Sequence, residues 1–286
     1  GVIRAVIGQA FINRSIRGRH CIIRRRIHFL GTGTAFAEAV ERAVALDGFT
    51  GVMPKEGATW QDAIASAGFF ANITFANRGT DYLQSTLPPS ALQHFWSLAV
   101  EEQFYIFWPI LVFTLWRIGR QRLVAVGIAI TTILSFVLSL FLTIVNPIWA
   151  FYSLPTRAWE LGIGALLLFI PEKFSARRTV VKTLSVWFGL FALAISVLAF
   201  SERTAFPGYN ALLPTIGTAL MIAGIAFWPP ILNDLSRLRI VQWLGEISYP
   251  FYLWHWPLLV LPSTRFGRPL TLIERIFFIL LTALAA

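Results

Sequence analysis

The most apolar stretches of the chain are long enough to cross a lipid bilayer. Residues 123–145 contain no charged residue, and neither do 183–200 and 211–228. A helix that crosses the hydrocarbon core needs about 20 apolar residues, because the core is about 30 Å thick and each residue adds about 1.5 Å. The pattern therefore predicts a membrane-spanning helix over each of these three stretches.

Weaker apolar stretches complete the pattern. They cover 63–76, 103–116, 158–170, 247–264 and 276–286. The stretch 103–116 reaches spanning length only if its helix starts within 95–102, and 276–286 resembles a helix that is cut short. The stretch 63–76 is a weak span or a re-entrant segment. Together the stretches predict an all-α fold, a polytopic transmembrane helix bundle.

Composition supports a membrane protein rather than a soluble one. Hydrophobic residues make up 56% of the 286 residues and charged residues 13%, whereas soluble domains have about 25% charged residues. So large an apolar excess does not fit inside a soluble core of this size, which excludes a soluble enzyme, a disordered tail and a disulfide scaffold. We assign the net charge of +10 to anchoring at the membrane surface rather than to nucleic-acid binding.

Basic residues alternate between the predicted loops. One set of loops holds nine of them, namely Arg117, Arg120, Arg122, Lys173, Arg177, Arg178, Lys182, Arg237 and Arg239. The intervening loops hold four, namely Arg157, Arg203, Arg265 and Arg268. Because cytoplasmic loops carry the excess of Lys and Arg, the richer set is predicted to be cytoplasmic. Residues 95–102, 152–160 and the end of the helix with His255 then lie toward the outer face.

The beginning of the chain does not fit this pattern. Residues 1–47 hold eight arginines and no clear span. Arg24, Arg25 and Arg26 form a basic patch that suits anionic lipid headgroups, although this stretch is alternatively not a native structural segment. We divide the chain into an atypical basic N-terminal segment, 1–52, and a transmembrane domain, 53–286.

The first polar cluster lies just before and within an apolar segment. Charged and polar side chains at membrane depth are costly unless they pair or face water, so they are functional candidates. Helical spacing places His94, Ser97, Glu101 and Tyr105 on one face. A base held by a carboxylate is what acyl transfer to an alcohol requires. A structural polar seam between helices fits the same spacing equally well.

A second cluster combines an ion pair with two glycines. Arg157 and Glu160 stand at i and i+3, where their side chains can pair. Gly162 and Gly164 leave room for a neighbouring helix or a ligand to approach closely. The simpler interpretation is an ordinary ion pair at the membrane edge.

A third cluster shares one helical face, with Ser248, Tyr252 and His255 at i, i+4 and i+7. A structural histidine between two interfacial tryptophans is the alternative interpretation. No spacing typical of a metal site is present, so we expect no metal.

These segments resemble a known family. Residues 95–105 with Trp108 and Pro109 resemble the signature of acyltransferase family 3, bacterial integral-membrane O-acyltransferases that modify surface polysaccharides, lipopolysaccharide or peptidoglycan. Residues 157–164 and 243–257 resemble two further motifs of the family, in the same order. The resemblance covers 53–286. The family's opening helix, with its arginine and the catalytic histidine, has no counterpart in 1–51, so we expect a fragment with an atypical N-terminus.

The resemblance implies a multi-pass protein of the bacterial inner membrane. It implies transfer of an acyl group, expected to be acetyl, from acyl-CoA to a hydroxyl of a cell-surface glycan. The implied partners are the lipid bilayer, acyl-CoA and the glycan, with no nucleic acid, and an extracytoplasmic partner domain in the intact protein is left open.

Most of the candidate residues lie in or beside the matched motifs, and three are proposed from their charge alone. The catalytic candidates are Glu101, which would orient the base, and Glu102, His94 and His255. The candidates for substrate binding are Ser97, Tyr105, Arg157, Glu160 and Tyr252. Arg24, Arg25 and Arg26 are candidates for the phosphates of coenzyme A.

Two other functions fit the same chain. A transporter or flippase of glycan or lipid-linked substrates also has charged residues at membrane depth and glycine-rich helices. An inactive membrane fragment or scaffold is consistent with the unmatched first helices. Acyl-CoA-dependent labelling of a glycan separates the enzyme from both.

Overall fold

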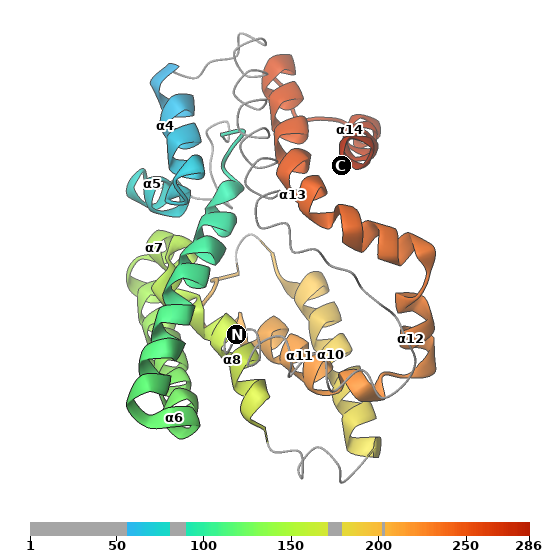
Figure 1. Ribbon diagram of the computed structural model, residues 1–286. Helices are drawn as coiled ribbons and strands as arrows, with labels where there is room; N and C mark the ends of the chain where they lie inside the picture. Colours follow the sequence, from blue (N-terminus) through green and yellow to red (C-terminus); the bar gives the residue numbers. More distant parts are fainter. Residues whose placement is uncertain (1–55, 81–89, 171–178, 202–203) are drawn as a thin grey trace.

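The fold is described from a computed structural model of residues 1–286, of which 56–80, 90–170, 179–201 and 204–286 are described here. All regular secondary structure in these residues is helical, which confirms the predicted all-α bundle (Figure 1). The helices are α4 (Glu56–Ala67), α5 (Ala71–Asn77), α6 (Phe95–Val145), α7 (Pro147–Tyr152), α8 (Ala158–Leu166), α10 (Thr179–Ala199), α11 (Leu212–Ala223), α12 (Pro230–Ser236), α13 (Arg239–Phe266) and α14 (Leu272–Ala285), with 3-10 turns η2 (Leu154–Thr156), η3 (Leu167–Phe169) and η4 (Ile225–Phe227). The predictions for 1–52, including Arg24, Arg25 and Arg26, lie outside the described residues.

Helix α6 contains two candidate membrane spans rather than one. Its arms, Phe95–Gly119 and Arg122–Val145, are each long and apolar enough to cross a bilayer. The arms fold back on each other, because a Cβ atom at Gly127 would lie 2.4 Å from the side chain of Leu115. In a straight helix these two residues would stand about 18 Å apart. Figure 1 shows the turn at the lower end of α6. The predicted stretch 103–116 therefore starts early enough to span.

The other apolar stretches differ in length from their predictions. Val181–Ala199 is a third candidate span and confirms the prediction for 183–200. The prediction of one continuous helix over 211–228 is wrong, because α11 ends at Ala223 and the chain tightens into η4 before two prolines, while the crossing itself stays a prediction. The apolar helix at 158–169 is likewise shorter than a span.

The weak span over 63–76 is not one continuous helix, because the chain breaks between α4 and α5, and the alternative of a re-entrant segment stays a prediction. Phe69 has a φ of 56°, a left-handed conformation that a helix cannot contain. A Cβ atom at Gly68 would lie 2.2 Å from the ring of Phe70. The glycine thus lets the chain reverse tightly at this point.

Helix α13 contains the predicted stretch 247–264 within 28 residues. Pro250, Pro257 and Pro262 lie inside it. Each proline lacks a backbone N–H and removes one helical hydrogen bond, which favours bending. Figure 1 shows that α13 changes direction along its length.

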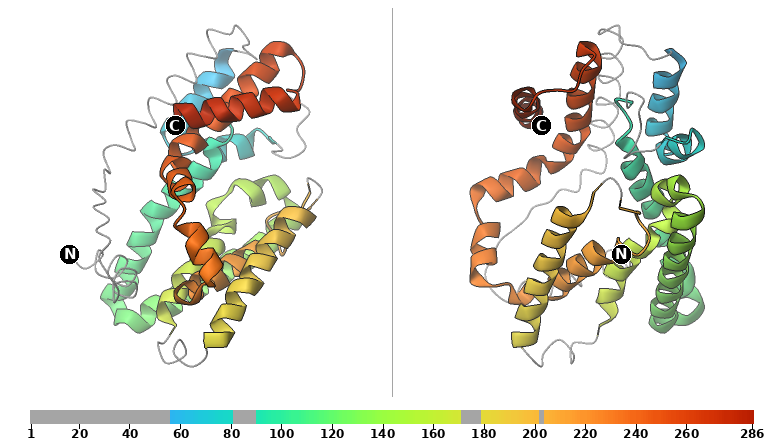
Figure 2. Two further views of the ribbon diagram at one scale, coloured as in Figure 1. Left: turned by 90° about the vertical axis from the view of Figure 1, so that its right-hand side faces the viewer. Right: turned by 180° about the vertical axis from the view of Figure 1, so that it is seen from behind.

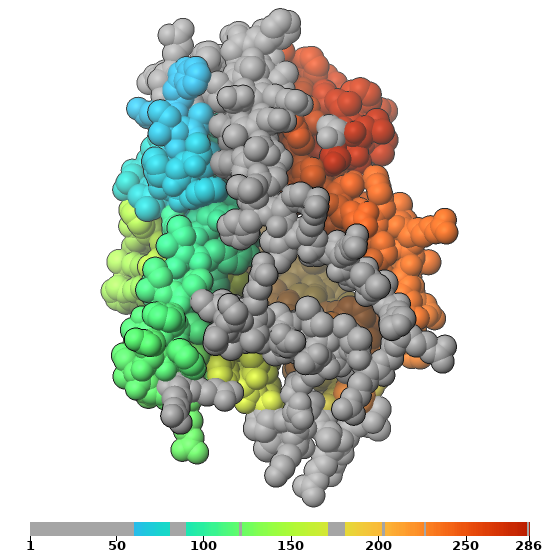
Figure 3. Space-filling view, viewed as in Figure 1, coloured from blue at the N-terminus to red at the C-terminus, as the bar shows by residue number. Residues whose placement is uncertain are grey.

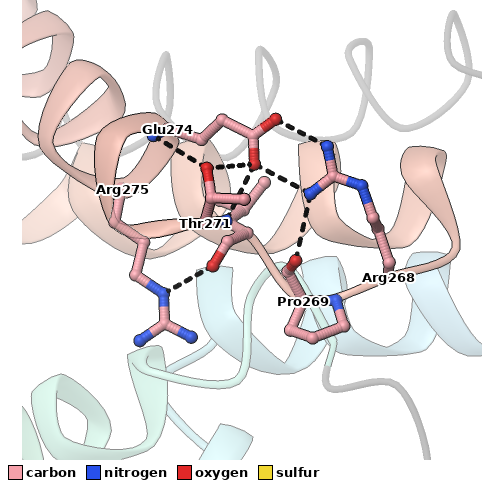
Figure 4. A network of polar contacts seen from close by, with 6 residues as sticks. Arg268, Pro269, Thr271, Glu274 and Arg275 are labelled. Carbon is pink, nitrogen blue, oxygen red and sulfur yellow. Dashed lines mark hydrogen bonds and ion pairs between the residues drawn. The ribbon is translucent and has the colours of Figure 1, made fainter.

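A polar network fixes the turn between α13 and α14 (Figure 4). Arg268 donates to both carboxylate oxygens of Glu274, at 2.9 and 2.7 Å. Thr271 and Glu274 form a capping box, which explains why α14 begins at Leu272, earlier than the predicted 276. The hydrogen bonds from Arg268, and those from Thr271, lower the pKa of Glu274 to about 2.

The faces of the spans suit lipid, while the described core lies at one end of the bundle. Ile144, Val197 and Leu198 are each more than 80% exposed, as expected of side chains that face acyl chains. The main apolar cluster joins α4 and α5 to the start of α6, to α7 and to α13. Figure 3 shows α4 and α6 on one side of the molecule and α13 and α14 on the other.

The helices α10 and α11 approach each other closely at two glycines. A Cβ atom at Gly189 would lie 2.5 Å from the carbonyl oxygen of Gly217, and one at Gly217 would lie 3.0 Å from that of Gly189. Figure 2 shows these two helices side by side, away from α4 and α5. Such small-residue contacts are typical of helix packing in membranes.

Candidate functional site

Three segments that are far apart in the sequence meet around the start of α6. Phe95 and Trp96 from α6, Tyr152 from α7 and Leu253 from α13 are buried in one apolar cluster. The sequence predicted that these three segments share one side of the membrane. Their meeting is consistent with that prediction, while the side itself stays a prediction.

His94 immediately precedes α6 and is almost completely buried, with 2% of its surface exposed. Its ring lies 5.5 Å from the ring of His255 and 5.3 Å from that of Tyr252, measured between centroids. Neither ring nitrogen has a hydrogen-bond partner in the described chain. Burial, and secondarily the neighbouring His255, lower the pKa of His94 to about 3, against a weaker opposing effect of the Leu253 backbone. The ring is therefore neutral at physiological pH.

His255 is half-buried and lies on α13. Its Nδ1 atom is 2.6 Å from the backbone carbonyl oxygen of Tyr252. A carbonyl oxygen only accepts hydrogen bonds, so Nδ1 carries the proton. In the neutral ring, Nε2 is then the atom with a free lone pair, and the tautomer is the one that a general base requires.

Two hydroxyl groups connect α6 to α13. The Ser97 and Tyr252 hydroxyl oxygens are 2.6 Å apart, and the Tyr252 hydroxyl donates to the carbonyl oxygen of His94. Because Tyr252 has one hydroxyl proton, Ser97 donates to Tyr252. Ser248, predicted on the same face, instead donates to the carbonyl of Gly245 and is exposed.

The two carboxylates of the signature lie further along α6. Glu101 is exposed and Glu102 is half-buried. In the described residues neither makes a hydrogen bond or ion pair with His94 or His255, so the expected contact between Glu101 and a base is not present. Tyr105, one turn further on, is 60% exposed. The catalytic and substrate-binding roles of these residues stay predictions.

The predicted pairing of Arg157 with Glu160 is confirmed, with 3.5 Å between Nη2 and Oε2. The Arg157 guanidinium also donates to the carbonyl of Phe151. Its central carbon lies 5.3 to 5.5 Å from the ring centroids of Trp96, Phe151 and Phe206. The other carboxylate oxygen of Glu160, Oε1, is buried without a hydrogen-bond partner. Arg157 therefore donates hydrogen bonds to Phe151 and Glu160 within the protein, whereas Oε1 of Glu160 accepts none from the described residues.

The two glycines that follow differ. A Cβ atom at Gly162 would lie 2.2 Å from Oγ1 of Thr132, so the close approach of α8 to α6 requires glycine there. A Cβ atom at Gly164 would meet nothing within 4 Å. The predicted close approach of a helix is thus confirmed at Gly162, whereas no helix approaches Gly164, where the approach of a ligand stays a prediction.

Sequence reasoning missed an amide pair that holds the signature helix. Gln103 donates to the side-chain oxygen of Asn72 and to the carbonyl of Phe69, each at 2.9 Å. Asn72 in turn donates to the carbonyl of Tyr152 at 3.1 Å. These contacts tie α5 and α7 to α6. The only signal in the sequence is Gln103 itself, a polar residue in an apolar helix.

Sequence reasoning also missed a buried acid in α4. Asp62 is 2% exposed and forms an ion pair with Arg78. Burial raises the pKa of Asp62, against the opposing effects of the Ser90 hydroxyl and of Arg78. An acidic residue among the small apolar residues of 62–67 is a weak signal of such a pair.

Comparisons with known proteins show which family the chain belongs to. A family model described as an acyltransferase domain matches residues 63–286. The chain is 34% identical over 223 residues to the putative peptidoglycan O-acetyltransferase YrhL of Bacillus subtilis, covering 73% of this chain and 35% of that protein. It is 32% identical over 213 residues to the peptidoglycan O-acetyltransferase OatA of Listeria monocytogenes, covering 71% and 34%.

A further relative is the O-acetyltransferase OatA of Staphylococcus aureus, which is 29% identical over 238 residues, covering 79% of this chain and 39% of that protein. The chain thus spans little more than a third of the length of these curated relatives. No solved structure matches it. Because the family model covers most of the chain, including all three predicted motifs, the protein belongs to acyltransferase family 3.

Proposed function

We propose that the intact protein transfers an acetyl group from acetyl-CoA to a hydroxyl of peptidoglycan at the bacterial inner membrane, which it crosses several times. Membership of the family and the similarity to peptidoglycan O-acetyltransferases support acetyl transfer to peptidoglycan rather than to lipopolysaccharide. The observation that carries the chemistry is the hydrogen bond from His255 Nδ1 to the carbonyl of Tyr252, because it leaves Nε2 as a proton acceptor.

The opening helix that carries the family's catalytic histidine has no counterpart in residues 1–51, so in this proposal His255 takes its place as the general base. Its Nε2 takes the proton of the glycan hydroxyl while the hydroxyl oxygen attacks the carbonyl carbon of the thioester. The new C–O ester bond forms and the C–S bond breaks, so coenzyme A leaves as the thiolate. The proton then passes from His255 to the thiolate, which restores the neutral ring.

His94 is the weaker candidate for the base. A group with a pKa of about 3 binds a proton poorly at neutral pH, and the ring is almost completely buried. His94 instead supplies a neutral aromatic surface against which His255 lies, at 5.5 Å between ring centroids.

The acceptor glycan is assigned to the side of Arg157 and Glu160. The Glu160 side chain is 23% exposed and Arg157 holds its carboxylate in place, so this carboxylate is the proposed acceptor of a hydrogen bond from a sugar hydroxyl. Ser97 and Tyr105 remain candidates for substrate contact. Arg24, Arg25 and Arg26 remain the proposed partners of the coenzyme A phosphates, since phosphate groups favour arginine clusters.

The test uses the full-length protein in lipid vesicles, with radiolabelled acetyl-CoA and soluble peptidoglycan fragments. His255→Gln, which keeps a polar side chain but cannot act as the base, is expected to lower kcat by at least about a hundred-fold. The control is Ser248→Ala, on the same helix, which should retain wild-type activity. Wild-type activity in His255→Gln would assign the base elsewhere. Movement of a lipid-linked glycan without acetyl transfer would favour the flippase.

Glu101→Gln tests the carboxylate of the signature separately. The change keeps the shape of the side chain and removes its charge. If Glu101 stabilises the protonated histidine, kcat falls by about ten-fold or more, which corresponds to about 1.4 kcal/mol of lost stabilisation of the transition state. Wild-type acetyl transfer in this variant would remove Glu101 from the mechanism.

A further inference from the structure

Two side chains of α13 donate to two backbone carbonyls at the start of α6. The Tyr252 hydroxyl donates to the carbonyl of His94, and the Trp256 indole N–H donates to the carbonyl of Ser90 at 2.9 Å. The donors stand at i and i+4 on α13, and the acceptors are also four residues apart. The spacing of one helical turn thus matches on both sides of the contact.

Both carbonyls belong to the turn that presents His94. The Ser90 carbonyl also accepts from the backbone N–H of Gln93, and the His94 carbonyl also accepts from that of Ser97, at 3.0 and 3.3 Å. The turn is therefore stabilised by its own backbone hydrogen bonds in addition to its contacts with α13. His255 lies between the two donors in the sequence, so any movement of α13 relative to this turn changes the separation of the two histidine rings.

We propose that Tyr252 and Trp256 form a two-point clamp that positions His255 for acyl transfer. Neither residue then acts on the substrate, and both are positioning residues. The proposal rests on the proposed function, in which His255 is the base. It replaces the sequence-based expectation that Tyr252 binds substrate.

Asp62 supports the clamp from the opposite side. Its carboxylate interacts with the hydroxyl of Ser90 and forms an ion pair with Arg78, and it is 2% exposed. The residue whose carbonyl receives Trp256 is therefore also held by α4. A buried carboxylate holds its partner in a fixed position more firmly than an exposed one, because water does not compete for the contact.

The alternative is that Tyr252 and Trp256 serve only as packing. Both rings lie near His94, with centroid distances of 5.3 and 6.4 Å. Tyr252→Phe and Trp256→Phe separate the two interpretations, because each removes a donor and keeps an aromatic ring. Tyr249→Phe and Trp254→Phe are matched controls on the same helix. Tyr249 and Trp254 pack against the same apolar cluster.

The first measurement is steady-state kinetics of the full-length protein in vesicles, with acetyl-CoA and peptidoglycan fragments. Each clamp variant is expected to lower kcat by about ten- to a hundred-fold with unchanged KM for both substrates, since misplacing a catalytic group by about 1 Å has effects of this size. The two controls should keep the wild-type kcat. A clamp variant with the kcat of its control, or with a raised KM and unchanged kcat, would overturn the proposal.

The second measurement is deuterium uptake by the backbone amides of 90–97, which does not require activity. Both clamp variants should exchange faster than the wild type and the two controls there, because the turn loses its contact with α13. Unchanged exchange would overturn the clamp even if kcat fell. If the wild type transfers no acetyl group, the proposed function fails and with it the catalytic role of the clamp, while faster exchange would still establish the contact.

Discussion

Arg157 shows how a charged side chain is accommodated at the edge of an apolar bundle. Its guanidinium pairs with Glu160, donates to the carbonyl of Phe151 and lies over three aromatic rings. A planar guanidinium can pack against a ring and donate from its edge at the same time, whereas a lysine ammonium is a compact charge with strong hydration. The site therefore requires arginine rather than a cation in general.

Arg157→Lys is expected to lower the free energy of unfolding by about 1 to 2 kcal/mol, the size of a partly desolvated cation–π contact. The measurement is thermal or denaturant unfolding of the purified protein in detergent. Arg265→Lys is the control, because it is the same substitution at an exposed arginine. Equal stability of the two variants would mean that the rings around Arg157 contribute nothing specific to arginine.

His94 makes stability depend on pH. Its pKa is about 3 in the folded protein and about 6.5 when unfolded, so the unfolded state binds the proton more readily. The stability contributed by the neutral ring is complete above pH 6.5 and is lost as the pH falls from 6.5 toward 3. At pH 5 the loss is about 2 kcal/mol, because each pKa unit corresponds to about 1.4 kcal/mol.

The check compares the unfolding free energy of the wild type with that of His94→Gln at pH 7.5 and pH 5. Glutamine does not titrate in this range, so the wild type should lose about 2 kcal/mol more than the variant on acidification. Identical losses would show that His94 is solvated and titrates normally. Acidic side chains contribute equally to both proteins and cancel in the comparison.

At the residue scale, local spacing predicted local contacts and failed for distant ones. The pairing of Arg157 with Glu160 follows from their i, i+3 positions, and the structure confirms it. The approach of His94 to His255 joins residues 161 positions apart, and no periodicity within one helix contains that information. His94 and Glu101 were predicted to share one helical face, but along this face His94 is buried whereas Glu101 and Tyr105 are exposed. Burial depends on which neighbouring helices cover each turn, and periodicity does not specify that.

At the scale of helices, Gly162 determines how closely α8 approaches the second arm of α6. Thr132 faces it and donates to the carbonyl of Ile128 at 2.7 Å. A methyl group at 162 would force the stiff, β-branched Thr132 side chain to abandon that bond. Gly162→Ala is therefore expected to destabilise the protein by about 1 to 3 kcal/mol, as overpacking does.

Gly164→Ala provides the matched control on the same helix. Nothing lies within 4 Å of a Cβ atom there, and alanine favours a helix over glycine by about 1 kcal/mol. The control should thus match or exceed the wild type in its unfolding midpoint. Adding Thr132→Ala to Gly162→Ala should restore part of the loss, whereas no recovery would place the strain elsewhere.

The helices themselves were predicted well where apolar length was the signal and poorly where the chain turns. The spans at 123–145 and 183–200 follow from composition alone. The break at Phe69 and the shortened α11 depend on backbone conformations that a run of apolar residues does not specify. The hairpin within α6 had a clear signal, because basic residues interrupt the apolar pattern at 117–122.

At the scale of the whole molecule, the arrangement of the helices is compatible with one orientation in the membrane. The turn within α6, the end of α8 and the beginning of α10 all lie toward the lower end of Figure 1. The loops that these helix ends flank hold seven of the nine basic residues of the predicted cytoplasmic set. From the positive-inside rule we therefore predict that the lower end is cytoplasmic and that the candidate site lies toward the outer face.

Labelling in intact cells tests this orientation directly. Ser201, after α10, and Asn233, in α12, are both exposed and are predicted to lie on opposite sides of the membrane. Each is replaced by cysteine in a separate variant. Cys21 is replaced by serine so that each variant has one thiol. A membrane-impermeant maleimide should label Ser201→Cys in intact cells, and should label Asn233→Cys only after the membrane is permeabilised.

The reverse pattern would place the histidine pair on the cytoplasmic side. The glycan hydroxyl would then have to reach the base from within the cell, and a lipid-linked precursor rather than assembled peptidoglycan would be the acceptor. Labelling of both cysteines in intact cells would mean that the segment between α10 and α12 does not cross the membrane. Because the short α11 has 12 residues, less than the length of about 20 that spanning needs, this measurement also decides whether α11 is a true span.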